Sequence, residues 1–217
     1  MNKTVNHYNH NYFENYQKKM GIFGGKANKF LFEKYIKKND VVLDFGCGGG
    51  FLLANLNCKQ KIGIEINEIS RNHCISQGID CHEKIDFIEN GSVDVIISSH
   101  CLEHTTSPYD NLEKIFNKLK KGGIVVIVVP TDSFMVKYKP KDINYHLYSF
   151  SPMNLGNLLD SVGFVEINAK PIFHKWPPFY LKIQNILGWK FFHWISFLYG
   201  YLSLSNVQIK AIAKKNY

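Results

Sequence analysis

The sequence predicts a doubly wound α/β fold, in which helices cover both faces of a largely parallel sheet. Short apolar runs, typical of buried strands, alternate with segments whose apolar residues recur at helical spacing. A cluster of glycines follows the first run, as expected for a tight turn between a strand and a helix. The chain of 217 residues, 45% hydrophobic and 20% charged, is long enough for one α/β domain with a sizeable core.

The glycine turn is the most informative segment. The apolar residues 41–43 lead into Asp44, and glycines follow at positions 46 and 48–50. A second short apolar run ends in Glu65. We expect a nucleotide-like ligand to lie across the turn, where glycine lets the backbone approach it, with Glu65 binding its ribose hydroxyls.

The residues around this turn discriminate between nucleotides. A G-x-G-x-x-G dinucleotide turn needs a glycine where this chain has Phe51, and Asp44 would repel a pyrophosphate. A G-x-x-x-x-G-K-[ST] phosphate loop is absent from the sequence. S-adenosylmethionine (SAM) carries a sulfonium and an ammonium and no phosphate. The turn therefore fits SAM better than NAD, and an NAD-dependent oxidoreductase is the weakest alternative.

Four motifs in order resemble those of the class I SAM-dependent methyltransferases. They are the Asp44–Gly50 turn, the acid Glu65, the Asp94–His104 stretch that ends in Leu-Glu-His, and the Leu119–Gly123 turn. The resemblance extends from about residue 29 to residue 164 and resumes at the last strand. It implies an α/β, Rossmann-like doubly wound sheet of seven strands, mostly parallel with an antiparallel last strand. It also implies that the protein binds SAM and releases S-adenosylhomocysteine.

The N-terminal half is expected to alternate helices with the first three strands. A polar, aromatic helix over 8–20 would lie over the cofactor until Gly24 and Gly25 break it, and helical spacing predicts a second helix over 27–37 that packs on the sheet. The elements that follow are a strand at 41–44, a helix at 51–56, a strand at 62–65, a helix at 68–77 and a third strand within 78–90.

The C-terminal half continues this alternation. Proline in the first turn and glycines beyond the end predict a helix over 108–119, and Ser151-Pro152 opens another that closes at Gly163. The β-branched run 124–129 is expected to be a central, buried strand. The remaining strands are expected at 93–98, 164–169 and 207–213.

Residues 176–205 form an aromatic-rich helical insertion before the last strand. They hold ten aromatic residues other than histidine, and the uncharged run after Lys190 is about fifteen residues, too short to span a bilayer core of roughly 30 Å. Three interpretations stay open. The segment could be a lid or homodimer face, a helix in peripheral contact with a membrane, or a wall of the acceptor pocket.

We expect a single methyltransferase domain over residues 1–217. Residues 1–38 would supply the N-terminal helices that cover the cofactor, and 39–170 the SAM-binding core. Residues 171–205 would supply the aromatic insertion or lid, and 206–217 the last strand.

Charge and cysteine content restrict the partners and the compartment. The net charge of +8 favours anionic partners, but the lysines are spread rather than gathered in one stripe, so we do not expect a nucleic-acid substrate. Five scattered cysteines without a C-x-x-C pair argue against disulfides and structural zinc and for a reducing compartment. The first residues lack a signal-peptide-like apolar run, which predicts a cytoplasmic protein, with membrane association through the aromatic segment as the alternative.

The resemblance assigns cofactor-binding roles to residues at the carboxyl ends of the strands. Glu65 would accept hydrogen bonds from the ribose and Ile66 would pack on the adenine, with Asp86 nearby. The methionine end of SAM would be held by Asp44, by the backbone of Gly46, Cys47 and Gly48, and by Ser98 and Ser99.

Histidines are the candidate catalytic residues, because methyl transfer to oxygen needs a base for the hydroxyl proton. His104 and His100 follow the fourth strand, and His146 lies in a segment that resembles the substrate-side loop of the family. We favour His104 as the base; alternatively, it orders the loop through a backbone hydrogen bond. We predict no metal site, although His100-x-x-Glu103-His104 resembles the Glu-x-x-Glu-His metal site of quinone-biosynthesis O-methyltransferases and also matches a zinc-protease pattern.

The absence of one motif restricts the classes of molecule that can be the methyl acceptor. Base-modifying members carry an N/D-P-P-Y/F motif after the fourth strand, where this chain has Ser98-Ser99-His100-Cys101. We therefore expect a small-molecule or sugar-linked (glycan-precursor) acceptor that is methylated on a hydroxyl. The alternatives are a quinone or phenol acceptor, and a non-catalytic SAM-binding partner subunit.

Overall fold

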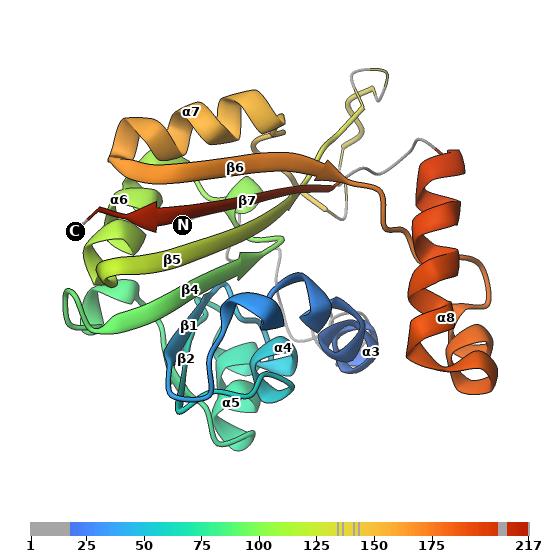
Figure 1. The fold of residues 1–217 in the computed structure, drawn as a ribbon, viewed down its shortest axis with the longest axis horizontal. Helices are drawn as coiled ribbons and strands as arrows, with labels where there is room; N and C mark the ends of the chain where they lie inside the picture. Colours follow the sequence, from blue (N-terminus) through green and yellow to red (C-terminus); the bar gives the residue numbers. More distant parts are fainter. Residues whose placement is uncertain are drawn as a thin grey trace.

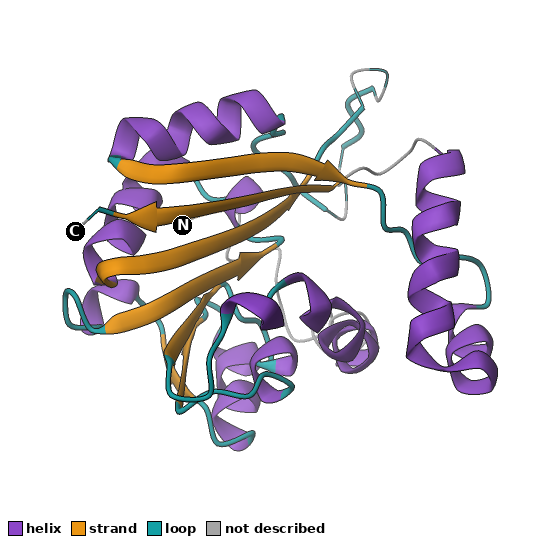
Figure 2. Cartoon of the chain, viewed as in Figure 1, coloured by secondary structure: helices purple, strands orange, loops and turns teal. Residues whose placement is uncertain are grey.

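The computed structural model describes residues 18–133, 135, 137–140, 142, 144–203 and 208–216. Its centre is a seven-stranded sheet with the order β3-β2-β1-β4-β5-β7-β6, and helices cover both faces (Figures 1 and 2). The strands are β1 Val41–Phe45, β2 Gln60–Ile64, β3 Asp80–His82, β4 Val93–Ser99, β5 Leu119–Pro130, β6 Phe164–Ile172 and β7 Gln208–Lys215.

The sheet confirms the predicted fold class. β1 pairs in parallel with β2 and β4, and β5 extends the parallel part beside β4. β7 is antiparallel to both of its neighbours and lies between β5 and β6. In the predicted run 124–129, which forms the second half of β5, residues 125–129 are buried and Ile124 is half-buried, as expected for a strand covered on both faces.

The helices are α3 Lys18–Asn28, α4 Phe51–Ala54, α5 Glu68–Ser76, α6 Pro108–Lys118, α7 Pro152–Val162 and α8 Tyr180–Ser203. Short 3-10 turns, labelled η, are η2 Lys29–Leu31, η3 Glu33–Tyr35, η4 Ile85–Phe87 and η5 Leu102–His104. The caps follow the sequence signals: Ser151 forms a capping box at the start of α7, and Gly163 ends that helix at a φ of 106°.

Two predictions about the N-terminal helices are wrong. α3 runs through Gly24 and Gly25 instead of breaking there, and two 3-10 turns replace the helix expected over 27–37. The glycines serve packing, because a Cβ on Gly25 would lie 2.3 Å from the carbonyl oxygen of Phe51 on α4. The helix predicted over 8–20 lies outside the described residues except for 18–20, which belong to α3.

The turn expected at 119–123 is also different, because β5 already begins at Leu119. Leu119 pairs with Val93, and the register then shifts so that Ile124 pairs with Val95. An irregularity in the strand thus takes the place of the predicted turn. The last strand begins at Gln208 in the described residues, and Val207 lies outside them.

The aromatic segment is helical, as predicted, but it does not join the layers around the sheet. α8 has a break at Gly188 (φ 76°, ψ 176°) and stands beside the sheet in Figure 1. It is tied to α3 by a small cluster in which Phe23 packs edge-on against Phe192 at 5.4 Å between ring centroids. Among the described residues, none of the helices combines the length and apolar character needed to cross a bilayer.

Candidate functional site

The glycine turn joins the carboxyl end of β1 to α4. The N–H groups of Gly46 and Cys47 donate to the carbonyl oxygen of Ile64, at 2.9 and 3.0 Å, which fixes the turn against β2. Gly46 adopts a φ of 81°, and a Cβ there would lie 2.2 Å from Sγ of Cys101. Only glycine fits both the backbone conformation and the space beneath the loop after β4.

Glu65 lies one residue beyond the end of β2, opposite the turn. Its carboxylate accepts hydrogen bonds from the N–H of Gly48 at 2.9 Å and of Asn67 at 2.8 Å. Burial raises the pKa of Glu65, and these two N–H groups act against that rise. Each carboxylate oxygen keeps a second lone pair, so Glu65 can also accept hydrogen bonds from ribose hydroxyls.

Asp44 is buried in the last part of β1, only 2% exposed. Its Oδ1 has no hydrogen-bond partner among the described residues. Burial, and secondly the charge of Glu65, raises the pKa of Asp44 to about 8. An orphaned buried carboxyl is costly, and a cationic ligand nearby would stabilise its charged form. The ammonium and sulfonium groups of SAM fit this requirement.

A cavity of about 470 Å³ opens at the carboxyl ends of β1 and β2. Gly46, Glu65 and Ile66 line it on one side, and His100 and His104 reach it from the loop after β4. The sequence interpretation missed several further lining residues. They come from loops, from η4, from the first turn of α5 and from the first two turns of α6: Asn67, Ser70, Glu83, Lys84, Ile85, Thr105, Thr106, Asn111 and Lys114. No motif marks these positions, because they meet only when α5, α6 and η4 pack around the cavity.

Three of the predicted cofactor-binding side chains, those of Asp86, Ser98 and Ser99, are already engaged within the protein or lie away from the cavity, and the buried Asp44 is not among the lining residues either. Asp86 lines it but is mostly exposed and pairs with Lys114 at 3.0 Å. The Ser98 hydroxyl is buried and donates to the carbonyl oxygen of Phe45 at 3.0 Å. Ser99 is half-buried and is not among the lining residues. The Cys47 thiol lies 3.6 Å from the sulfurs of both Cys74 and Cys81, so only its backbone belongs to the turn.

The loop after β4 gathers histidines around one buried acid. Glu103 is 0% exposed, and neither carboxylate oxygen has a hydrogen-bond partner among the described residues. Its Oε1 lies 3.8 Å from Nδ1 of His100 and 3.6 Å from Nε2 of His104. Burial raises the pKa of Glu103 to about 8. An imidazolium formed on either histidine would have this carboxyl as its closest acidic neighbour.

His146 joins this cluster from a distant segment. Its ring packs edge-on against that of His104, with 5.1 Å between the centroids, and its Nδ1 contacts the Asp132 carboxylate at 2.9 Å. Nδ1 of His104 lies 3.4 Å from the carbonyl oxygen of Tyr145, which favours the tautomer with hydrogen on Nδ1 and the lone pair on Nε2. The structure thus brings all three predicted histidines together, but only His100 and His104 line the cavity.

Two side-chain clusters have the composition of metal ligands. Glu103, His104 and His146 each offer one atom within 4.8 Å of the others, and one carboxylate with two imidazoles suits a divalent transition ion. In this cluster His146 takes the place that the sequence motif gave to His100. Cys47, Cys74 and Cys81 form the second cluster, although they are far apart in the sequence.

Comparison with known proteins identifies the family. Residues 8–168 match the family model described as "Methyltransferase domain". The tRNA U34 carboxymethyltransferase of Vibrio cholerae is 27% identical over 154 residues, which cover 60% of this chain and 46% of that protein. The ubiquinone biosynthesis O-methyltransferase of Aeromonas salmonicida is 24% identical over 148 residues, covering 57% of this chain and 62% of that one.

Solved structures share the fold at low sequence identity. A SAM-dependent methyltransferase of Thermotoga maritima, described as a possible histamine N-methyltransferase, has a TM-score of 0.69 at 17% identity, covering 98% of this chain and 100% of that one. A Haemonchus contortus phosphoethanolamine N-methyltransferase solved with SAM has a TM-score of 0.57 at 15% identity, covering 94% and 59%.

The family model covers most of the chain, and the buried acid, the glycine turn and the acid after β2 fit a cationic nucleoside cofactor. The chain belongs to the class I SAM-dependent methyltransferases, and SAM is its cofactor.

Proposed function

We propose that the protein transfers a methyl group from SAM to a hydroxyl of a small molecule or sugar-linked precursor. The observation that carries this proposal is the histidine cluster around Glu103, which borders the cofactor cavity. When bound, SAM supplies an electrophilic methyl group, and the protein must place a hydroxyl in line with it and take up its proton.

The chain's own residues divide this work. Glu65 holds the ribose, and Asp44 with the backbone of Gly46, Cys47 and Gly48 binds the methionine end. Ile66, half exposed at the edge of the cavity, packs on the adenine. These roles account for the orphaned Oδ1 of Asp44 and for the double hydrogen bond that orients Glu65.

His104 is the proposed base. Its Nε2 accepts the hydroxyl proton, and the charge that develops on the ring is stabilised by Glu103 at 3.6 Å. His146 and the Tyr145 carbonyl hold the ring in place, so we assign His146 a positioning role. His100 is the second candidate, because it also lines the cavity and its Nδ1 lies 3.8 Å from the Glu103 carboxyl.

The proposal is tested first by titration calorimetry with SAM, S-adenosylhomocysteine and NADH. We expect micromolar binding of the first two and none of NADH. Labelled SAM is then offered with separate pools of nucleotide sugars, phenols and RNA. Label on a sugar hydroxyl supports the proposal, whereas label confined to RNA contradicts it, and SAM binding without any transfer points to a non-catalytic subunit.

A phenolic acceptor of the quinone-precursor type is the second candidate. It is favoured by the Glu103, His104 and His146 cluster, which has the composition of a metal site, and by the match to a ubiquinone biosynthesis O-methyltransferase. If the acceptor is phenolic, methyl transfer to catechols should require a divalent ion. Activity that survives chelation and dialysis would count against the metal while leaving the base mechanism intact.

A further inference from the structure

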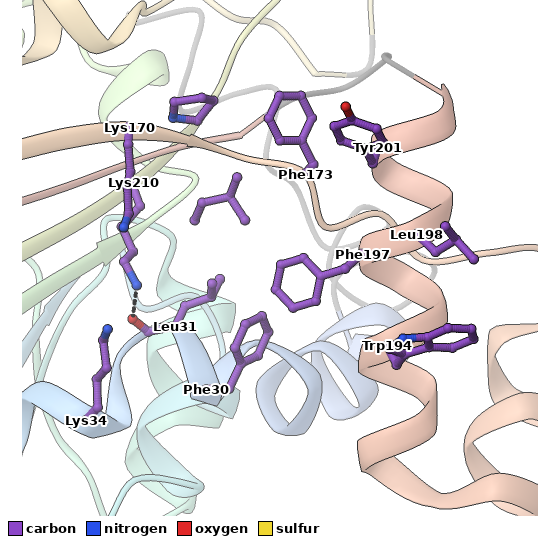
Figure 3. Close-up of a pocket in the computed structure, with 12 residues that line it drawn as sticks. Phe30, Leu31, Lys34, Lys170, Phe173, Trp194, Phe197, Leu198, Tyr201 and Lys210 are labelled. Atoms are coloured by element: carbon purple, nitrogen blue, oxygen red, sulfur yellow. Dashed lines mark hydrogen bonds between the residues drawn. The ribbon is translucent and has the colours of Figure 1, made fainter.

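A second, larger hollow lies on the other side of the 3-10 turns that follow α3. It has a volume of about 780 Å³ and lies between η2 and η3, the end of β6, the start of β7, and α8 (Figure 3). The lining residues are Phe30, Leu31, Lys34, Lys170, Pro171, Ile172, Phe173, Trp194, Phe197, Leu198, Tyr201 and Lys210. We call this hollow the α8 groove. None of its lining residues lines the cofactor cavity, so it is a separate site.

One end of the α8 groove concentrates positive charge. Lys170 and Lys210 are direct partners across β6 and β7, and Lys34 approaches them from η3 (Figure 3). Like charges directly opposite one another destabilise a sheet. Among the described residues, no carboxylate forms an ion pair with any of the three lysines.

Lys210 is the most confined of these lysines, only 7% exposed. Its Nζ donates to the carbonyl oxygen of Leu31 at 3.0 Å and lies 5.2 Å from the ring centroid of Tyr35. Burial, and then the charges of Lys34 and Lys170, lowers the pKa of Lys210 to about 8. A bound anion would relieve this mutual repulsion, because an opposite charge favours the protonated amine.

The other end of the groove is apolar and continues onto an exposed face of α8. Trp194, Leu198 and Tyr201 recur at spacings of four and three residues, and they are 59%, 46% and 64% exposed. The buried side of the same helix carries Phe192, Ser196 and Gly200. A Cβ on Gly200 would lie 2.5 Å from the carbonyl oxygen of Phe173, so glycine allows the close contact that holds α8 beside the groove.

The two ends together define the chemistry of the occupant. A free phosphate would use the lysines and leave the aromatic wall empty, while an uncharged apolar surface would leave the lysines unpaired. A ligand with an anionic head and a hydrocarbon tail satisfies both ends. Exposed tryptophan, tyrosine and leucine beside lysine are also the composition of a helix that rests in a lipid interface.

We propose that the α8 groove binds an anionic phospholipid at a membrane surface, with its phosphate at Lys34, Lys170 and Lys210 and its tail along Phe173, Phe197 and Leu198. The exposed face of α8 rests on the same bilayer. This site goes beyond methyl transfer, and it would place the cofactor cavity close to acceptors that reside in or on the membrane.

Vesicle co-sedimentation of the full chain tests the proposal. Vesicles of phosphatidylcholine alone are compared with vesicles that contain roughly a third phosphatidylglycerol, a fraction that gives a strongly negative surface. We expect binding to the anionic vesicles only, together with a blue shift of tryptophan fluorescence. The double variant Lys34→Glu/Lys170→Glu should weaken binding by at least tenfold, since each lysine near such a surface is worth about 1 kcal/mol.

Matched controls separate the groove from net charge and from exposed apolar area. Lys59→Glu/Lys121→Glu makes the same change in charge outside the groove and should reduce binding far less. Trp194→Gln/Leu198→Gln removes the apolar wall and should abolish the fluorescence shift, whereas Met153→Gln, on the exposed side of α7, should leave it intact.

Other occupants give distinct results, each of which overturns the proposal. Equal binding to neutral vesicles, or equal losses in both lysine double variants, would mean that the lysine cluster is not a head-group site. Binding of inorganic phosphate without any vesicle binding would identify a simple anion site. A dimer in light scattering that dissociates in Trp194→Gln/Leu198→Gln, with no lipid binding, would make this face a contact between two copies. Because the test needs neither SAM nor acceptor, it is independent of the proposed function.

Discussion

The two hollows of this protein are lined by ionisable groups of opposite kind, acids in one and lysines in the other, and are built in different ways. Three acids lie in or beside the cofactor cavity: Asp44 and Glu103 are buried and Glu65 is half-buried, and each has a raised pKa. The α8 groove gathers three lysines and an aromatic wall. The turn and the acids of the cavity come mostly from short loops that directly follow three strands. The groove needs residues that are up to 180 positions apart in the chain, from Phe30 to Lys210. Chemistry encoded in short loops can be recognised in a sequence, whereas chemistry assembled across the fold cannot.

Replacement of His104 should give the largest effect confined to the cavity. We expect His104→Ala to lower kcat by about 10²- to 10⁴-fold, the usual contribution of a general base, while SAM affinity changes little. Single-turnover methyl transfer with calorimetry on the same preparation checks this split. His146→Ala, as a positioning variant, should lose less activity than His104→Ala. Equal losses in kcat and SAM affinity for His104→Ala would show that the residue only orders the loop.

The Asp44→Asn variant should weaken SAM binding by roughly 10- to 150-fold, since contacts to charged groups are worth about 1.5–3 kcal/mol. Asparagine keeps the shape of the side chain and removes the charge that the cationic ligand needs. Vesicle binding through the α8 groove should be unchanged in this variant. Unchanged SAM affinity would remove Asp44 from the site.

The Gly46→Ala variant should destabilise the glycine turn by about 1–3 kcal/mol, because alanine is strained at a φ of 81° and its Cβ would collide with Cys101. SAM binding should be lost with it. Gly91→Ala is the matched control: Gly91 also has a positive φ, of 67°, but nothing lies within 4 Å of its added Cβ. Chemical denaturation of both variants measures the difference, and similar losses would show that backbone strain alone accounts for the effect.

The raised pKa of Asp44 also predicts a smaller effect, on the free energy of unfolding. Because its pKa is about 8 in the folded protein and 3.8 ordinarily, the folded state holds the proton more tightly, and the free energy of unfolding falls as pH rises between these values. Asp44→Asn should therefore be more stable than the parent at pH 8, by about 1–3 kcal/mol, and nearly equal to it at pH 4. Thermal melts should show roughly 2–4 °C per kcal/mol. An advantage that does not grow with pH would contradict the assignment.

The order of elements and the glycine turn were predictable from the sequence, because buried parallel strands and strand-to-helix turns have local signatures. The helix break expected at Gly24 and Gly25 was wrong, because these glycines serve close packing of α3 and do not end a helix. That packing depends on Phe51 and Trp176, which no local pattern connects to them.

The side-chain clusters likewise could not be predicted from local sequence patterns. Cys47, Cys74 and Cys81 appear scattered in the sequence, yet they meet because a turn, α5 and β3 pack together. Gly63 on β2 leaves the room for them, since a Cβ there would lie 2.7 Å from Sγ of Cys47. His146 likewise reaches Glu103 and His104 only through the loop that precedes α7.

The pairing of Lys170 with Lys210 also bears on how selective the α8 groove can be. Both lysines are fixed by the hydrogen-bonded register of β6 and β7, so their spacing is as rigid as the sheet. The opposite wall belongs to α8, which has a break at Gly188 and is held by side-chain packing. The lysine end of the groove thus has a backbone fixed by strand pairing, whereas the aromatic end can shift with α8. Such a site would discriminate strictly between head groups while accepting tails of different length and saturation.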